Sequence, residues 1–216
     1  LHVRSRRQRQ MCIRDSVRNN SELTTGRQVE VGSKFDFWDG KGSATVAAFE
    51  IRRKNIASQD PSNPNLTVLV GEQSSKGIEL SAGISPTPQW QLQGNLALTR
   101  ARYENFVQGG VSRAGNVPQL VPQQVANLWA SYAITPTVTA SAGVRHVGKV
   151  YGNAANTKFW PSYTLLDLGL AWKVNKTTTL TTRVRNATDR IYAAETRDQV
   201  YLGAPRTLDV TLHTAF

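Results

Sequence analysis

The chain has 216 residues, enough for a full hydrophobic core, so its length excludes no globular class. Hydrophobic residues make up 39% of it, and no run approaches the roughly 20 apolar residues of a membrane-spanning helix, which excludes a helical membrane protein. The formal net charge of +11 would suit a nucleic-acid partner, but arginines crowded into residues 1–18 supply much of it, and the remainder is only mildly basic.

The first sixteen residues, LHVRSRRQRQMCIRDS, do not fit the rest of the chain. They have neither the apolar core of a signal peptide nor a period of 2 or 3.6, and position 1 is not Met. The string resembles translated sequencing-adapter read-through, so we expect residues 1–16 to be a foreign segment outside the fold. The alternative is a basic arm for nucleic acid or acidic lipid. The domain is then 17–216, and we expect it to be truncated on its N-terminal side.

From residue 27 onward, apolar and polar residues alternate, as in strands with one apolar face. In SYTLLDLGLAW, Leu166, Leu168 and Leu170 share one face, and Asp167 and Gly169 share the other. Most of the segments are long enough for a tilted strand that crosses a bilayer in about 9–11 residues. The alternation predicts nine strands, at 27–38, 42–54, 74–85, 89–104, 122–134, 137–148, 162–174, 177–187 and 206–216.

Short and long connections take turns between these strands. The expected short ones are 39–41, 86–88, 135–136 and 175–176, and the expected long ones are 55–73, 105–121, 149–161 and 188–205. An up-and-down barrel with tight turns on one rim and long loops on the other has this rhythm, and a Greek-key sandwich does not require it. We therefore predict an all-β, antiparallel, up-and-down transmembrane β-barrel. It would be incomplete, because bacterial barrels have an even number of strands.

The residues suggest no catalytic or metal site. The three histidines lie far apart and none has a partner at a metal-ligand spacing, so we expect no metal and no enzyme. Arg183, Arg185, Glu79 and Asp167 lie on the lumen-facing parity and are expected to form charge networks inside the barrel. The aromatic residues of the long connections are expected mainly to anchor the barrel at the bilayer interface, with ligand contact as the alternative.

Five segments carry a specific resemblance when taken in order. They are VEVGSKFDFWDGKGSATVAAFEIRRKNI, GEQSSKGIELSAGISPTPQWQLQGNLALTRARYE, VPQQVANLWASYAI, RVRNATDRIYAAE and GAPRTLDVTLHTAF. Together they resemble the C-terminal half of the barrel of TonB-dependent outer-membrane receptors, most of all ferric-siderophore receptors. The resemblance implies a barrel of about 22 strands with a plugged lumen, of which this chain supplies the last nine. RNATDRIY departs from the Asn-Leu-Phe-Asp type of string usual in the family.

The resemblance also implies a function, partners and a location in the bacterial outer membrane. Such receptors bind a ferric-siderophore in their outer loops and import it when TonB pulls on an N-terminal region. Because the plug and that region are missing here, the fragment itself is not expected to transport. Outer-membrane lipid and the barrel-assembly machinery are further expected partners, nucleic acid is not, and no cofactor is expected because iron is held within the siderophore.

Loop residues are the candidates for contact with the chelate, namely Tyr103, Phe106, Tyr151, Phe159, Trp160, Arg197 and Tyr201. The last strand would close the barrel, and its lipid-facing residues would serve as the C-terminal assembly signal: Leu208, Val210, Leu212 and Phe216. Two other functions stay open at this point. One is an outer-membrane barrel of another kind, a porin or an adhesin, and the other is a soluble β-sandwich binding module.

Overall fold

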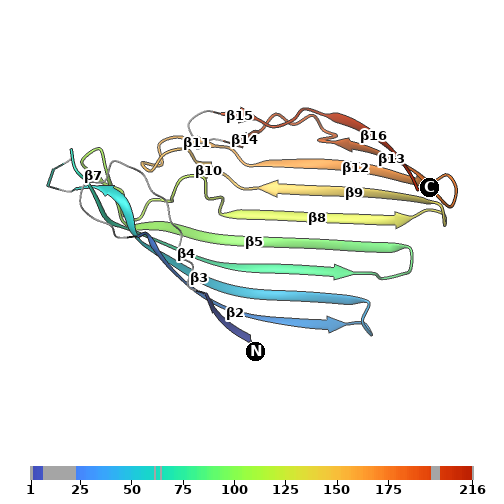
Figure 1. Ribbon diagram of the computed structural model, residues 1–216, viewed down its shortest axis with the longest axis horizontal. Coiled ribbons are helices and arrows are strands. Elements are labelled where there is room, and N and C mark those ends of the chain that lie inside the picture. The colour runs from blue at the N-terminus through green and yellow to red at the C-terminus, as the bar shows by residue number, and fades with distance from the viewer. Residues whose placement is uncertain (1, 7–22, 61, 64, 196–199, 216) are drawn as a thin grey trace.

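A computed structural model describes residues 2–6, 23–60, 62–63, 65–195 and 200–215, and this part of the chain is all β (Figure 1). One antiparallel sheet holds ten strands in the order β1-β2-β3-β4-β5-β8-β9-β12-β13-β16. Their bounds are β1 His2–Arg6, β2 Thr25–Phe37, β3 Gly42–Gln59, β4 Thr67–Ile84, β5 Trp90–Asn105, β8 Gln124–Ala133, β9 Val138–Val147, β12 Tyr163–Lys173, β13 Thr178–Arg185 and β16 Thr207–Thr214. No helix in these residues is long and apolar enough to cross a membrane.

Each long strand pairs with the next long strand of the chain, so the nine expected strands and their up-and-down order are confirmed. Short turns lie at the right-hand end of the sheet in Figure 1, and the long connections lie toward the left-hand end. Three small hairpins form within the long connections: β6 (Val107–Gln108) with β7 (Val111–Ser112), β10 (Val150–Tyr151) with β11 (Phe159–Trp160), and β14 (Ala193–Glu195) with β15 (Tyr201–Leu202). A two-sheet sandwich is therefore wrong for this chain.

The expected long connection 55–73 is wrong, because both flanking strands continue into it. β3 extends to Gln59 and β4 begins at Thr67, which leaves a loop of only 60–66. The register shifts between Arg53 and Ile56 and shifts back between Ile56 and Ala57, and Asn55 takes a left-handed backbone with φ of 58°. A bulge of this kind leaves a residue unpaired and disrupts the ladder locally. The alternation breaks at that point in the sequence, although the strand does not end.

β1 is a strand that the alternation did not predict. His2–Arg6 pairs with β2 from His2 opposite Gly32 to Arg6 opposite Gln28. Residues 7–22 lie outside the described part. The prediction that residues 1–16 are foreign to the fold, with 17–216 as the domain, stays a prediction.

The sheet has an apolar face and a polar face. On the apolar face, Val31, Ala48, Ile78 and Leu98 stand opposite one another across β2 to β5, and three of the four are more than 40% exposed. Such a row of exposed apolar side chains is what a lipid-facing barrel wall presents.

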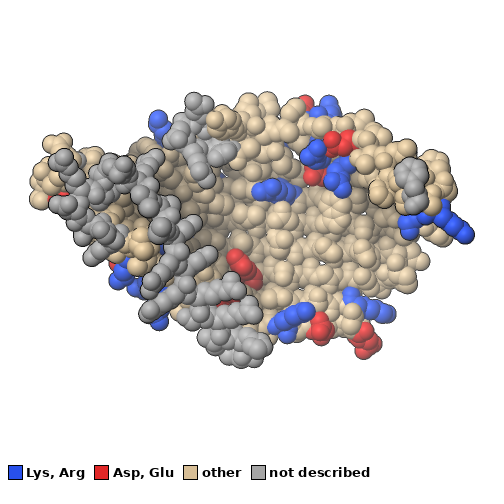
Figure 2. All heavy atoms as spheres, viewed as in Figure 1, with Lys and Arg blue, Asp and Glu red and all other residues tan. Residues whose placement is uncertain are grey.

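The polar face carries a hollow of about 510 Å³ over the middle strands. Asn95 and Asn127 face each other there across β5 and β8, and Asn127 Nδ2 donates a hydrogen bond to Asn95 Oδ1 at 2.9 Å. Arg145 and Asp167 line the same hollow. Figure 2 shows one broad face of the molecule, on which most charged side chains gather in small groups of both signs, with wide uncharged surface between the groups.

Glycines on the strands lie under aromatic rings of the neighbouring strand. The register places Gly42 opposite Phe37, Gly77 opposite Phe49, and Gly143 opposite Trp129. In each pair the ring occupies the space that a Cβ on the glycine would need. Since glycine weakens a strand, the covering ring restores packing at these points.

We predict that Gly77→Val destabilises the sheet by roughly 1–3 kcal/mol, because overpacking forces neighbouring atoms to shift. A Cβ at Gly77 would lie 2.5 Å from the carbonyl oxygen of Leu98 and 2.5 Å from Cζ of Phe49. Gly26→Val is the matched control, since a Cβ at Gly26 meets nothing within 4 Å. The measurement is the urea midpoint of the full-length protein in lipid vesicles, and equal midpoints for the two variants would contradict the prediction.

Candidate functional site

The loop rim, defined as the described residues of 60–66, 105–123, 148–162 and 186–206, is the candidate functional site. Its segments leave the sheet at the end away from the tight turns (Figure 1). The short connections at the opposite end of the sheet are tight turns of a few residues. In the first of them Trp38, Asp39 and Gly40 all take positive φ, and Lys41 N–H donates to the carbonyl oxygen of Trp38 at 3.0 Å. Any site built from several connections must therefore lie on the loop rim.

Asn156 joins two of the rim segments. Its side-chain oxygen accepts from Val117 N–H at 2.8 Å, and its Nδ2 donates to the carbonyl oxygen of Val117 at 2.8 Å. Asn116 Nδ2 adds a bond to the carbonyl oxygen of Ala154, whose side chain is fully buried. The side-chain amide of Asn156 thus pairs with the backbone of Val117 as a neighbouring strand would, and it fixes the position of one loop relative to the other.

Ser58 makes the corresponding link between β3 and β6. Its side chain is buried at 4% exposure, and Oγ accepts from Val107 N–H at 2.8 Å and lies 3.2 Å from the carbonyl oxygen of Val107. Gln59 Oε1 also accepts from Gly110 N–H at 3.2 Å. The extension of β3 beyond its bulge therefore supports the neighbouring loop.

Asn186 fixes the last segment of the rim. It is 3% exposed, and its backbone N–H donates to Asp167 Oδ1 at 2.8 Å. Its side chain bonds the N–H and the carbonyl oxygen of Arg190 and the carbonyl oxygen of Ala204. Asn also tolerates the left-handed conformation found here, with φ of 49°. The segment RNATDR thus contains a buried residue that links β12, the residues after β13 and the residues before β16 by hydrogen bonds.

Two of the candidate ligand residues pack against each other at the base of the rim. Tyr103 is 7% exposed, and its ring stacks on Phe106 with centroids 4.4 Å apart and planes at 12°. Tyr103 follows Thr99 and Ala101 on the polar face of β5, where exposure falls steadily toward the rim. The structure therefore gives Tyr103 a packing position.

Three other candidates come together on the β10–β11 hairpin. Lys149 Nζ lies 4.7 Å from the centroid of the Tyr151 ring and 5.5 Å from that of Phe159, and it donates to Tyr151 Oη at 3.1 Å. Phe159 is 57% exposed. Trp160 pairs with Val150, and its buried Nε1 has no hydrogen-bond partner among the described residues. This cluster presents a cation between two aromatic rings at the surface.

The two remaining candidates lie near β14–β15. Tyr201 is 56% exposed on β15, whereas Arg197 lies outside the described residues. Tyr192 packs against Tyr163 with ring centroids 4.5 Å apart and planes tilted by 35°, and it occupies the space beside Gly203. The structure thus does not gather all seven candidates at one point: Tyr103 and Phe106 form one pair, and Tyr151, Phe159 and Trp160 form a separate group.

Charges on the rim and on the polar face form local pairs. The Arg185 guanidinium binds Asp209 at 2.7 Å across β13 and β16. Asp167 takes part in the Asn186 contact, and no ion pair of Glu79 or Arg183 is found among the described residues. In the loop 60–66, hydrogen bonds from Ser62 and Asn63 hold the pKa of Asp60 below its usual value.

The last strand has the expected faces. Leu208, Val210 and Leu212 are 61–65% exposed on the apolar face of β16, and Phe216 lies outside the described residues. Their role as an assembly signal stays a prediction.

Sequence reasoning missed the residues that hold the rim together, which are Ser58, Lys149, Asn156 and Asn186. Asn and Ser in loops are a weak signal, because they serve turns as often as they serve contacts between distant segments. Lys149 could have been found, since it stands two residues before an aromatic residue in a short hairpin.

Comparison with known proteins gives one family and consistent relatives. Residues 14–187 match the family described as TonB dependent receptor-like, beta-barrel. A probable TonB-dependent siderophore receptor, PiuA of Acinetobacter baumannii, is 31% identical over 172 residues, which are 76% of this chain and 23% of that protein. The metal-pseudopaline receptor CntO of Pseudomonas aeruginosa is 33% identical over 197 residues, or 87% of this chain and 27% of that protein.

Solved structures agree with this. The crystal structure of PiuA superposes with a TM-score of 0.79 at 27% identity, over 89% of this chain and 28% of that one. The ferric preacinetobactin receptor BauA of Acinetobacter baumannii gives a TM-score of 0.79 at 29% identity, over 97% and 33% of the two chains. The chain thus spans about a quarter to a third of the length of the proteins it matches.

We predict that Asn156→Gly loosens the two loops that Asn156 joins. Glycine keeps the positive φ of 58° but removes both bonds to Val117, at a cost of about 1–2 kcal/mol. Hydrogen exchange at the Val117 amide should then be roughly tenfold faster. Asn65→Gly is the control, since no hydrogen bond of the Asn65 side chain is found among the described residues. An unchanged exchange rate of the Val117 amide in Asn156→Gly would contradict the prediction that Asn156 holds the two loops together.

Proposed function

Since the chain belongs to the TonB-dependent receptor β-barrel family, whose members are outer-membrane proteins, we propose that it forms part of a receptor for TonB-energised uptake of ferric-siderophore complexes. The observation that carries the proposal is the loop rim, where interlocked segments present exposed aromatic rings above an up-and-down sheet with an apolar face. This family consists of receptors and transporters, and it is not an enzyme family.

The sheet is proposed to be a sector of a larger closed barrel. Among the described residues, β16 pairs only with β13, so its other edge carries unpaired N–H and C=O groups. Hydrocarbon does not tolerate such an edge, because each unpaired group there costs several kcal/mol. Closure with further strands removes this cost, and the share of each relative's length that the chain matches is consistent with it.

The rim geometry supports selective binding in preference to passive diffusion. Asn156, Ser58 and Asn186 link the loops through side-chain hydrogen bonds, and Phe159 is exposed on one of these loops. Fixed loops lower the ordering cost of binding. We propose that Phe159, Tyr151 and Tyr201 contact the chelate, while Tyr103 and Phe106 support the loop beneath.

Uptake of radiolabelled iron tests the proposed function directly. The full-length protein would be produced in a strain that lacks other siderophore receptors, and ferric hydroxamate and ferric catecholate chelates would be supplied with and without TonB. Uptake of at least one chelate that stops without TonB is expected. Energy-independent diffusion of small solutes, with no TonB-dependent uptake, would favour a porin and overturn the proposal.

We predict that Phe159→Ala combined with Tyr201→Ala raises the chelate concentration for half-maximal uptake roughly tenfold, because two exposed rings are lost from the binding rim. Trp38→Ala is the matched control, since Trp38 is 60% exposed in a turn at the opposite end of the sheet. An equal effect of Trp38→Ala would show that general destabilisation, not loss of ligand contact, explains the result.

A further inference from the structure

The apolar face ends abruptly at its loop-rim side, where charged side chains continue the same strands. One row across the sheet reads Val31, Ala48, Ile78 and Leu98, and the next row toward the rim reads Val29, Glu50, Lys76 and Arg100. Arg52 and Arg102 follow in the third row, opposite Ser74. We name the outward-facing charged set the charged collar: Arg27, Glu50, Arg52, Lys54, Glu72, Lys76, Arg100, Arg102 and Glu104.

The collar lies at the edge of the apolar band. On β5 the band runs from Trp90 to Leu98, roughly 27 Å along the strand and roughly 20 Å in height after a tilt of about 40°. An outer-membrane barrel has an apolar band about 25 Å tall, so Arg100 and Arg102 stand at the level of the lipid headgroups. Long loops mark the outer side of such barrels, which places the collar in the outer leaflet.

The opposite edge of the band has a different composition. There the apolar face ends in aromatic rings, among them Phe35, Trp90, Tyr132 and Trp172, each 38–51% exposed. Trp90 and Tyr132 lie 4.7 Å apart between centroids. Aromatic rings are the usual side chains at both bilayer interfaces. On the apolar face of β2 to β5, cationic side chains therefore replace the aromatic rings at the loop-rim edge but not at the turn edge.

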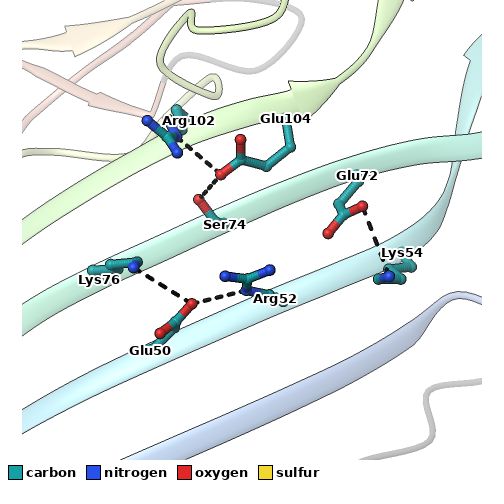
Figure 3. A network of polar contacts seen from close by, with 8 residues as sticks. All are labelled: Glu50, Arg52, Lys54, Glu72, Ser74, Lys76, Arg102 and Glu104. Atoms are coloured by element: carbon teal, nitrogen blue, oxygen red, sulfur yellow. Dashed lines mark hydrogen bonds and ion pairs between the residues drawn. The ribbon is translucent and has the colours of Figure 1, made fainter.

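Only part of the positive charge is compensated within the collar (Figure 3). Glu50 receives Arg52 Nε at 2.8 Å and Lys76 Nζ at 3.6 Å. Glu104 receives Arg102 Nε at 2.9 Å and Ser74 Oγ at 2.6 Å.

The third carboxylate of the collar, Glu72, has one cation close to it. Lys54 Nζ lies 3.9 Å from Glu72. Six cationic side chains thus face three carboxylates.

Cations of the collar stand directly opposite one another, and one member of each opposed pair has no carboxylate partner among the described residues. Lys76 is the cross-strand partner of Arg100, and Arg27 is that of Arg52, and like charges in this relation are destabilising. Arg27 and Arg100 make no ion pair among the described residues. The contacts of Arg52 and Arg102 use Nε, which leaves their terminal nitrogens for an external anion. A guanidinium fork of this kind fits a phosphate group.

We propose that the charged collar binds the phosphate groups of outer-leaflet lipid headgroups. The lipid tails cover the apolar rows below, and the phosphates sit between Lys76, Arg100 and Arg102, where they relieve the repulsion between opposed cations. The carboxylates keep the side chains extended along the sheet. The inference goes beyond ligand uptake, and it depends on the outer-membrane location and not on the identity of the chelate.

Native mass spectrometry of the full-length protein tests the proposal with defined lipids. Bis-phosphorylated lipid A should remain bound after a detergent wash, and dephosphorylated lipid A with the same acyl chains should be retained roughly tenfold less. Equal retention of the two lipids would overturn the proposal. Displacement of the lipid by millimolar inorganic phosphate would also overturn it, since the collar would then be a site for free anions. Both measurements use the protein without any substitution.

The variants locate the contact. Arg100→Gln with Arg102→Gln should lower retention of bis-phosphorylated lipid A roughly tenfold, because both cations lie in the proposed site. Arg53→Gln is the control, as Arg53 is exposed beside Arg52 on the opposite parity of β3. Gel mobility before and after heating verifies that each variant has assembled. Equal losses in Arg53→Gln and in the double variant would refute binding at the collar.

Discussion

The whole structure depends on one constraint, the pairing of every backbone N–H and C=O group in a chain that must lie in hydrocarbon. The antiparallel ladder satisfies it for each strand interior, and this is why neighbouring strands in the chain are also neighbours in the sheet. Side chains then have only two directions. One parity meets lipid and the other meets the lumen, so the division of residues between the two faces follows from the ladder and from no separate rule.

The loop rim is subject to the same requirement without the benefit of a ladder. Its backbone groups leave the sheet, and side-chain amides and hydroxyls pair with them. Asn156 bonds both polar groups of Val117, Ser58 lies within hydrogen-bond distance of both polar groups of Val107, and Asn186 bonds both polar groups of Arg190. Each of these residues replaces a missing strand partner. The rim thereby gains the fixed shape that a selective binding surface needs.

Much of this architecture could be predicted from the sequence, because a period of 2 and the positions of turn residues are local signals. The nine strands, their order and the lipid-facing parity of Leu208, Val210 and Leu212 follow from them. The extension of β3 could not be predicted, since the irregular pairing around Asn55 interrupts the alternation of apolar and polar residues in mid-strand. Contacts such as that of Asn156 depend on how two distant loops meet, and sequence spacing carries no information about that. The packing of Tyr103 could have been predicted, since it continues the inward parity of Thr99 and Ala101.

The lengths of the strands connect the membrane wall to the loop rim. β3 and β4 have 18 residues each, whereas a tilted strand crosses the bilayer in about 9–11. The surplus lies on the loop-rim side, where it carries both the charged collar and the Ser58 contact to β6. Headgroup binding at the collar would hold these extensions at a fixed height above the bilayer, because the charges cannot sink into hydrocarbon without a large desolvation cost. Lipid contact on the outer face of the sheet and the geometry of the loop rim are thus coupled through β3 and β4.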